Sequence, residues 1–331
     1  GAGPVVEYAV KMRRLPQERM LKKLLQEGQA RPEMLEAVAR RLALFHAEAE
    51  TGGEIDRIGG VETIQRNHEE NFEQTEPFIG RTIPAEQYRF IRVYALGFLE
   101  RERALFDRRV ADHRIRDCHG DLHLEHILVT DEILIFDCIE FNERFRCEDV
   151  AAEVAFLSMD LDFNGYADEA AHFVEAYIGC TGDTEIRTLL NFYKCYYAYV
   201  RGKVVGFRLD DPAIGAPDRE EAARTAARYF DLAYTYAARL ERPTLILIAG
   251  LMGTGKSELA RRLAPLLGAE IIRMDVLRKE ILALGPADRH YENFGEGIYS
   301  DEISRKTYDT ALRRTEDLLA AGNSVIIDAS Y

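Results

Sequence analysis

The stretch DCHGDLHLEHILV, residues 117–129, gathers many of the side chains in this chain that could do chemistry. Within eight consecutive positions it contains His119, Asp121, His123, Glu125 and His126. Imidazole and carboxylate groups bind metal ions, and they also take up and release protons. One hypothesis is a zinc cage, because His119, Asp121 and His123 alternate and would share one face of a strand. Gly120 would interrupt that strand and no C-x-x-C pair accompanies it, so this hypothesis is the less favoured one.

The second hypothesis is a loop that transfers a phosphoryl group. Such a loop needs an aspartate that accepts the proton of the attacking hydroxyl, and a second aspartate, one hairpin later, that binds magnesium. Asp121 suits the first role. Asp137 suits the second, because it follows two short apolar runs at the end of LIFD. The layout matches that of the protein-kinase motifs H-R-D-L-x-x-x-N and D-F-G.

A second phosphate-binding motif lies in the last third of the chain. The octapeptide GLMGTGKS, residues 250–257, is a complete G-x-x-x-x-G-K-S that follows an apolar strand and precedes a helix. Its glycines let the backbone N–H groups face phosphate oxygens. The nucleotide-binding residues that it predicts are Gly250, Gly253, Thr254, Gly255, Lys256 and Ser257. Lys256 would reach the terminal phosphates, and the Ser257 hydroxyl would bind magnesium.

Three further side chains could serve that nucleotide. Asp275 and Arg278 are three residues apart at the start of a predicted helix, so they share one face. Asp275 could take a proton from a second acceptor hydroxyl, and Arg278 could hold the substrate or its phosphate. A helix-capping aspartate beside a surface arginine is an equally good interpretation. Asp328, at the end of SVIID, is placed like a Walker B carboxylate that orients magnesium, and a solvated strand-end acid is the alternative.

The elements that must position these residues differ between the two parts of the chain. Before the histidine-rich loop we expect a helix opened by Pro16, a helix over residues 31–50 and a long amphipathic helix from about Pro84 to Val110. The loop should follow a strand end at RIRD and lead into a hairpin, HILVTDEILIFD. Helical periodicity then continues for about ninety residues after Asp149, and we interpret its aromatic run, residues 192–199, as core packing. From Arg242 onward strands alternate with helices, which predicts a parallel sheet.

Composition excludes several classes of function. The net charge of −14 argues against nonspecific binding to nucleic acid or to an anionic membrane. No apolar run is long enough to span a membrane, and the N-terminal residues lack the pattern of a signal peptide. The five cysteines show neither a disulfide framework nor zinc spacing, so we expect reduced thiols and a cytoplasmic location. The sequence does not indicate an oligomeric state.

The loop HGDLHLEH, together with the later IFDCIEFN, resembles the aminoglycoside phosphotransferase and choline kinase group, whose loop reads H-G-D-L-H-x-x-N. The resemblance covers roughly Val5 to Leu240 and implies a protein-kinase-like fold with a largely helical C-lobe. It also implies that Asp121 is the catalytic base, that His119 braces the loop, and that Asp137 binds magnesium with ATP.

One position departs from that family. His126 stands where the family has an Asn that binds magnesium, and histidine prefers softer ions. Either His126 takes the role with altered geometry, or Glu125 or Glu140 substitutes for it. In RCEDVAAEVAFL, Asp149 matches the family aspartate that braces the catalytic loop. Lys11, in YAVKM, has no Gly-rich loop before it, so we expect it on the last strand of an N-lobe that is mostly absent from this sequence.

Residues 244–331 resemble the small P-loop kinases typified by polynucleotide kinase and zeta toxin, through GLMGTGKS, the D-x-x-R of Asp275 and Arg278, and VIIDAS. The resemblance implies that Asp275 is a general base and that a later lid supplies arginines. We expect that lid, and further strands, to be absent from this sequence. The whole chain resembles a bacterial family of fused proteins, a kinase-like domain (residues 1–241) followed by a P-loop ATP-binding domain (residues 242–331).

Three functions are compatible with these features. The first is a kinase with two ATP- and magnesium-dependent sites that phosphorylates hydroxyls of a small molecule, such as a sugar or an aminocyclitol. The second is regulatory: the kinase-like half, with His126 in its loop, would sense a ligand and control the P-loop half. Antibiotic resistance ranks third, because a resistance kinase does not need the second domain. The sequence does not identify the acceptor.

Overall fold

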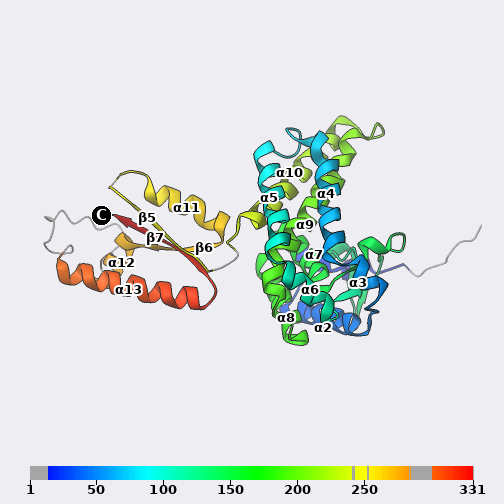
Figure 1. Ribbon diagram of the computed structural model, residues 1–331, viewed down its shortest axis with the longest axis horizontal. Helices are drawn as coiled ribbons and strands as arrows, with labels where there is room; N and C mark the ends of the chain where they lie inside the picture. The colour runs from blue at the N-terminus through cyan, green and yellow to red at the C-terminus, as the bar shows by residue number, and fades with distance from the viewer. Residues whose placement is uncertain (1–13, 241–242, 252, 283, 285–299, 331) are drawn as a thin grey trace, which may run out of the picture. The chain divides into compact units, whose positions relative to one another are not determined.

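The computed structural model describes residues 14–240, 243–251, 253–282, 284 and 300–330 (Figure 1). The expected strand that contains Lys11 lies outside these residues. The chain forms two compact units that divide between Ala233 and Tyr234. The division falls slightly before the expected boundary at residue 242.

The first unit is mostly helical. Its α-helices are α1 (Leu21–Gln26), α2 (Pro32–Glu48), α3 (Glu54–Ile58), α4 (Val61–Thr75), α5 (Ala85–Arg101), α6 (Arg103–Ala111), α7 (Val150–Phe163), α8 (Ala167–Thr181), α9 (Ile186–Phe207) and α10 (Ala216–Ala238). Its short 3-10 helices are η1 (Gln17–Arg19), η2 (Glu76–Phe78), η3 (Leu124–His126), η4 (Glu143–Phe145) and η5 (Arg208–Asp210). Its strands are β1 (Ile115–Asp117), β2 (Ile127–Val129), β3 (Ile133–Ile135) and β4 (Cys147–Asp149).

Two of the predicted helices are each divided. The segment opened by Pro16 forms the 3-10 turn η1 before α1 begins, because Met20 between them has an extended backbone. The predicted helix from Pro84 to Val110 consists of α5 and α6, which meet at Glu102, where the backbone leaves the helical conformation. The apolar pattern continues across that break, since Phe98 and Phe106 still contact each other edge to face. Hydrophobic periodicity alone therefore did not reveal it.

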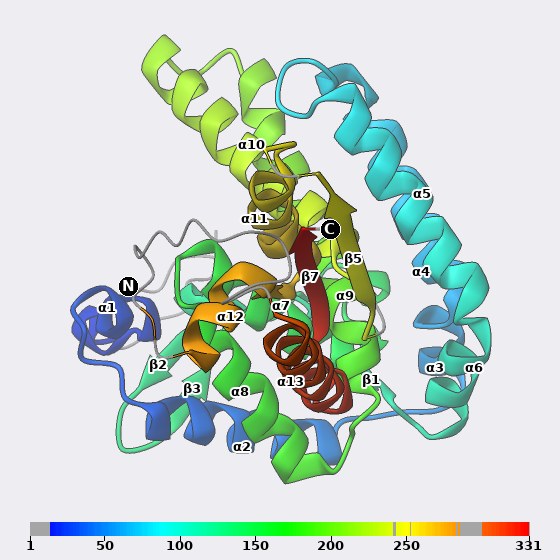
Figure 2. The ribbon, with the colours of Figure 1, turned by 90° about the vertical axis from the view of Figure 1, so that its left-hand side faces the viewer.

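Helix α7 forms the centre of the first unit. Its residues from Val150 to Leu161 are buried, and it packs against α8 and α9, while α2 packs against α8 (Figure 2). The aromatic residues of α9 contribute to this core as predicted: Phe192 stacks on Phe98 with ring centroids 4.6 Å apart, and Tyr197 stacks on Phe156 at 4.1 Å. The rings are buried, so most of the aromatic run is core packing.

The small strands of the first unit hold the histidine-rich loop at both ends. Strand β1 pairs antiparallel with β4, and β2 pairs antiparallel with β3 as the predicted hairpin. The hairpin is confirmed with Ile127 opposite Ile135. Loop residues 118–126 therefore run from the end of β1 to the start of β2, and the segment after β3 returns beside them.

A buried arginine fastens α6 to the start of α7. Arg109 is fully buried, and its guanidinium donates to both carboxylate oxygens of Asp149 at 2.6 and 2.9 Å. It also donates to both oxygens of Asp183 at 2.6 and 2.8 Å. Burial alone would lower the pKa of Arg109, but the carboxylates of Asp149 and Asp183 together outweigh burial and raise it.

Replacing Arg109 by methionine should destabilise the first unit strongly, because two buried carboxylates lose their shared partner. Breaking a buried ion pair from one side typically costs about 3–5 kcal/mol. Urea denaturation measures the loss. Arg108→Met is the matched control, since the neighbouring Arg108 pairs with Glu185 at the surface and should lower the free energy of unfolding by less than about 1 kcal/mol. Equal losses in the two variants would contradict this account.

The second unit is built on a parallel sheet. Its strands are β5 (Leu245–Gly250), β6 (Ala269–Arg273) and β7 (Ser324–Ser330), and its helices are α11 (Lys256–Leu267), α12 (Met274–Ile281) and α13 (Asp301–Ala320). The strand order is β5-β7-β6, so β7 is central, and both pairings are parallel as predicted. Figure 1 shows α11 on one face of the sheet and α12 with α13 on the other.

The side chains of β7 explain why helices pack on both faces of the sheet. Ile326 packs with Ala260 and Ala264 of α11, whereas Val325 and Ile327 pack with residues of α12 and α13. Alternate residues of a strand point to opposite faces, so a strand covered on both sides is apolar throughout. Within the described part of the chain, no helix is long and apolar enough to cross a membrane.

Candidate phosphotransfer sites

The histidine-rich loop is tied to the segment that follows β3. The ring of His119 donates from Nε2 to the Phe136 carbonyl at 2.8 Å and accepts at Nδ1 from the Asp121 N–H at 3.3 Å. The backbone of Ile139 also donates to the His119 carbonyl at 3.0 Å. His119 thus has the bracing position that the family resemblance implied, and both of its ring nitrogens are engaged.

Gly120 is required where the loop turns. Its φ is +81°, a conformation that costs little only for glycine. A Cβ there would also lie 2.6 Å from the Phe145 carbonyl oxygen, closer than real contacts allow. The backbone of the loop therefore packs directly against η4 at Gly120. Asp121 is the next residue of the loop after this contact.

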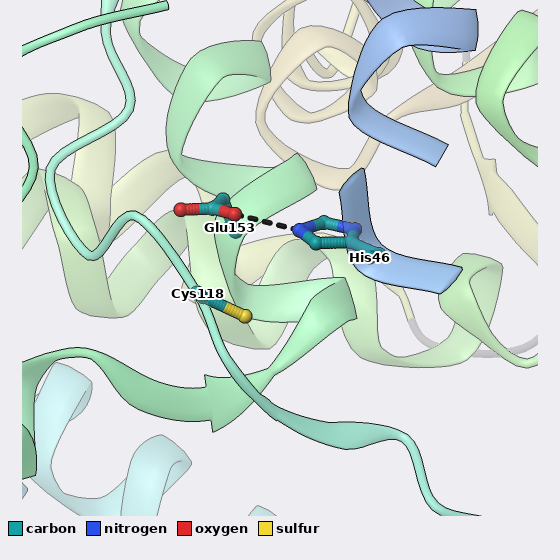
Figure 3. A group of neighbouring side chains, drawn as sticks. All are labelled: His46, Cys118 and Glu153. Atoms are coloured by element: carbon teal, nitrogen blue, oxygen red, sulfur yellow. Dashed lines mark hydrogen bonds and ion pairs between the residues drawn. The ribbon is translucent and has the colours of Figure 1, made fainter. Parts of the chain in front are cut away.

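A buried glutamate braces this loop from behind. Glu153 of α7 accepts the backbone N–H groups of His119 at 2.8 Å and Gly120 at 2.9 Å through one carboxylate oxygen. Its other oxygen lies 2.6 Å from Nε2 of His46 (Figure 3). The expectation that Asp149 braces the catalytic loop is wrong: Asp149 binds Arg109 and accepts the Ala151 N–H at the start of α7.

The pKa of Glu153 is lowered despite its burial. Burial alone would raise it, but the hydrogen bond with His46, the charges of His46 and His119 and the Gly120 N–H outweigh that effect. The brace is therefore an anion. A buried carboxylate that accepts several N–H groups favours its charged form in this way.

His46, Cys118 and Glu153 lie close enough together to suggest a metal site (Figure 3). Their chemistry does not fit one. Both ring nitrogens of His46 are engaged, one by Glu153 and the other by the Tyr177 hydroxyl at 2.7 Å. Burial raises the pKa of the Cys118 thiol well above its ordinary value, so a thiolate ligand is disfavoured. We interpret this group as the support of the loop.

Asp121, His126 and Asp137 meet at the front of the loop. The Nδ1–H of His126 donates to the Asp121 carbonyl at 2.8 Å. This leaves the lone pair of its Nε2 directed toward the carboxylate of Asp137, 3.4 Å away. Asp137 adopts a left-handed backbone conformation (φ 67°) and its side chain is 76% exposed, so its carboxylate can turn toward a cation. The unexpected histidine thus lies between the two predicted aspartates, and a cation could bind both its Nε2 and the Asp137 carboxylate.

The pKa shifts of Asp121 and His126 suit a proton acceptor and a metal ligand, respectively. Burial would raise the pKa of Asp121, but the close approach and charge of His123, together with the charge of Arg201, lower it below its ordinary value. Burial, and secondarily the charge of His123, lowers the pKa of His126. At neutral pH Asp121 is a carboxylate and His126 is a neutral imidazole, the form that binds a metal ion.

The structure leaves fewer candidate ligands for the cation than the sequence did. Glu125 pairs with Lys22 at 2.5 Å, which engages it elsewhere, and Glu140 is exposed. A cage of His119, Asp121 and His123 would need ring nitrogens of His119 that the backbone already engages. The ligand atoms that do lie within 4.8 Å of one another belong to Asp121, His123 and His126. Oxygen ligands suit magnesium, and an added imidazole suits manganese or zinc as well.

A cavity opens beside Asp121. Its volume is about 460 Å³, in the range of small-molecule sites. Its walls come from α4, α7 and α9, from Gly120 and Asp121 of the loop, and from residues 139–149. The sequence did not predict this cavity, because its walls come from segments far apart in the chain.

The P-loop has the geometry that its motif predicts. Gly253 and Gly255 adopt positive φ angles of 80° and 85°, and α11 begins directly after them. The ammonium of Lys256 donates to the Leu251 carbonyl at 2.6 Å, within its own loop. Ser257 donates from its hydroxyl to Asp328 at 2.5 Å. Asp328 is 5% exposed on the central strand, so a solvated strand-end acid does not describe it.

An arginine that the sequence analysis did not single out connects the acids of this site. Arg273 ends β6 opposite Asp328 in the strand register. Its guanidinium lies 3.0 Å from Asp275 and 3.9 Å from Asp328. Asp275 therefore lies at the same sheet edge as the P-loop, but it is the second residue of α12 and 61% exposed. Arg278 follows on the next turn of α12 and is partly buried.

Comparison with known proteins agrees with this geometry. Residues 7–189, more than half of the chain, match the phosphotransferase enzyme family. The chain belongs to this family. Residues 245–331 match an AAA domain. The predicted order, a phosphotransferase-like domain followed by a P-loop kinase-like domain, is confirmed, and so is the predicted two-part fold.

Three curated relatives of this phosphotransferase-family chain are each named as an uncharacterized protein. It is 33% identical over 333 residues to uncharacterized protein Mb2027c of Mycobacterium bovis and to uncharacterized proteins MT2060 and Rv2004c of Mycobacterium tuberculosis. Each alignment covers 100% of this chain and 65% of the relative, so the chain spans about two thirds of their length. A solved structure, Plasmodium vivax ethanolamine kinase Pv091845, is similar at 17% identity and a TM-score of 0.42, over 61% of each chain.

Proposed function

We propose that the protein is an ATP- and magnesium-dependent kinase with two nucleotide-using sites, each of which phosphorylates a hydroxyl of a small molecule such as a sugar or an aminocyclitol. One observation carries the proposal: Asp121, His126 and Asp137 meet beside a cavity of substrate size. A proton acceptor and two cation ligands are adjacent there, as phosphoryl transfer requires. The family match supports a kinase-type activity.

At the first site, Asp121 would accept a hydrogen bond from the acceptor hydroxyl. The hydroxyl oxygen would attack the terminal phosphorus of ATP, the bond to the ADP oxygen would break, and Asp121 would take the proton. A carboxylate of low pKa is a weak base, so we expect Asp121 to orient the hydroxyl first and to accept the proton late. Asp137 and His126 would hold magnesium, whose charge offsets that of the phosphate oxygens.

At the second site, Lys256 would exchange the Leu251 carbonyl for the terminal phosphates of a nucleotide. Ser257 and Asp328, already in contact, provide the oxygen ligands that magnesium prefers. Asp275 would serve as the base for a second hydroxyl. These roles rest on the P-loop geometry and on the position of Asp275 at the same sheet edge.

Calorimetric titration of the full-length protein with a non-hydrolysable ATP analogue and magnesium tests the proposal. We expect two binding sites per chain, and Lys256→Met should remove one of them. Lys306→Met, a surface change on α13, should leave both. A single site that Lys256→Met abolishes would contradict the first site and favour the regulatory alternative, in which the kinase-like half does not bind magnesium and ATP.

The cation preference of the first site should depend on His126. We expect wild type to work better with manganese than with magnesium, and His126→Asn to shift the ratio of the two rates toward magnesium by about tenfold or more. The rates are measured in a Lys256→Met background, which silences the P-loop site. His172→Asn, which alters a partly exposed histidine on α8, is the control. An unchanged ratio in His126→Asn would show that His126 does not bind the cation.

A further inference from the structure

The cavity beside Asp121 has an unusual charge balance for a chain with a net charge of −14. Four acidic side chains line it: Glu70, Asp121, Glu148 and Asp149. Arg144 binds Glu70 through two hydrogen bonds of 2.8 and 2.6 Å, and Asp149 is held by Arg109. Glu148 is bound by the Tyr197 hydroxyl.

A negative charge on Glu148 is disfavoured in this cavity. Burial, and next to it the charge of Glu153, raises the pKa of Glu148 well above its ordinary value, which favours the neutral form of this side chain. Of the four lining acids, Asp121 is the one that neither accepts a hydrogen bond from an arginine among the described residues nor has its pKa raised. A cationic acceptor would find little compensation here apart from the catalytic aspartate itself.

Lys203 contributes an uncompensated positive charge to the same cavity. Its ammonium donates to the side-chain oxygens of Asn71 at 2.5 Å and Gln74 at 2.7 Å, and both partners are neutral amides. Glu70 lies near enough to raise the pKa of Lys203, but burial and Arg144 lower it overall. Glu70 is thus one negative charge close to three positive charges, those of Arg144, Lys203 and Arg66.

The cavity also presents polar groups suited to hydroxyls. Oδ1 of Asn67, Oε1 of Glu148 and the hydroxyl of Tyr193 are buried and have no hydrogen-bond partner among the described residues. All three residues line the cavity, and Tyr193 is 3% exposed. Buried polar atoms are nearly always hydrogen-bonded, and the hydroxyl groups of a ligand could supply partners for these three.

We propose that the acceptor of the first site is an anionic polyol, whose phosphate or carboxylate binds Lys203 and Arg144 while one of its hydroxyls faces Asp121. This inference rests on the proposed function and narrows its acceptor class. It favours a sugar derivative over an aminocyclitol, because the ammonium groups of an aminocyclitol would lie beside Lys203 and Arg144. Arg144 belongs to η4 and Lys203 to α9, so the cluster depends on the folded chain.

Binding of sugars to the full-length protein without nucleotide tests this inference separately from catalysis. The probes are glucose 6-phosphate, gluconate, glucose and glucosamine, measured by calorimetry. We expect one of the two anionic sugars to bind at least about tenfold more tightly than glucose, as one charge-assisted hydrogen bond provides. Comparison of these two distinguishes a phosphate site from a carboxylate site.

Lys203→Met should reduce binding of the anionic sugar by about tenfold and leave glucose binding unchanged. Lys203→Arg keeps the charge and should retain most of the affinity, and Lys306→Met should have no effect. Equal or tighter binding of glucose or glucosamine would overturn the inference, and so would an equal loss of all sugars in Lys203→Met. Competition by the ATP analogue would also overturn it, because the cluster would then serve the nucleotide.

The outcome is independent of the proposed kinase activity. If the anionic sugar binds through Lys203 but receives no phosphate from ATP, the anion-binding site stands and the kinase function, with the acceptor role, fails. If a neutral sugar is phosphorylated while no anionic sugar binds, the kinase function stands and the inference fails.

Discussion

Asp121→Asn is expected to reduce phosphate transfer at the kinase-like site by about 10²–10⁴-fold, because the variant loses the group that accepts the proton of the acceptor hydroxyl. The loop itself should persist, since His119, Gly120 and Glu153 hold it through bonds that do not involve the Asp121 carboxylate. Initial rates with saturating ATP, in a Lys256→Met background, measure the effect. The loss should appear in kcat, with little change in the affinity for nucleotide.

Asp131→Asn is the matched control for this variant, because Asp131 lies exposed in the turn of the β2–β3 hairpin. It makes the same chemical change close by in the sequence and should keep the wild-type rate. If Asp121→Asn retained the rate of Asp131→Asn, the histidine-rich loop would not be catalytic.

Lys256→Met is expected to lower turnover at the P-loop site by about 10²–10³-fold, the usual cost of removing one fixed donor to developing charge. The side chain is already held within its loop by the Leu251 carbonyl, and exchange of that bond for phosphate oxygens costs little reorganisation. The measurement is ATP turnover in an Asp121→Asn background. Nucleotide affinity at this site should fall as well, because the lysine contacts the phosphates in the bound state.

Lys306→Met controls for the loss of a lysine from the same unit, since Lys306 is exposed on α13. It should leave turnover unchanged. Full turnover in Lys256→Met would show that the motif does not bind nucleotide in this protein.

Sequence patterns predicted one pair of residues in each site. The β2–β3 hairpin returns Asp137 to within 3.4 Å of His126, because two short apolar runs are joined by a tight turn. The P-loop and Asp328 meet because the carboxyl ends of neighbouring parallel strands lie at one sheet edge. The first pair follows from a short-range rule, and the second, 71 residues apart, follows from the alternation of strands and helices that predicts a parallel sheet.

Contacts between distant segments were not predictable in the same way. Glu153 braces the catalytic loop from α7, and its one sequence signal is a lone acid in the apolar stretch VAAEVAFL. Arg273 and the cavity around Lys203 gave no such signal, because their partners are set by how helices and strands pack. Asp149 was assigned to the loop by resemblance, whereas the structure gives it to Arg109.

Phosphorus NMR of transfer from ATP tests the central claim most directly. The full-length protein, Asp121→Asn and Lys256→Met are each incubated with ATP, magnesium or manganese, and a panel of sugars, sugar phosphates and aminocyclitols. The account predicts new phosphoester signals that divide between the variants, with one signal lost in Asp121→Asn and another lost in Lys256→Met. Identical products from wild type and Asp121→Asn, together with no product from Lys256→Met, would contradict a catalytic role for the histidine-rich loop.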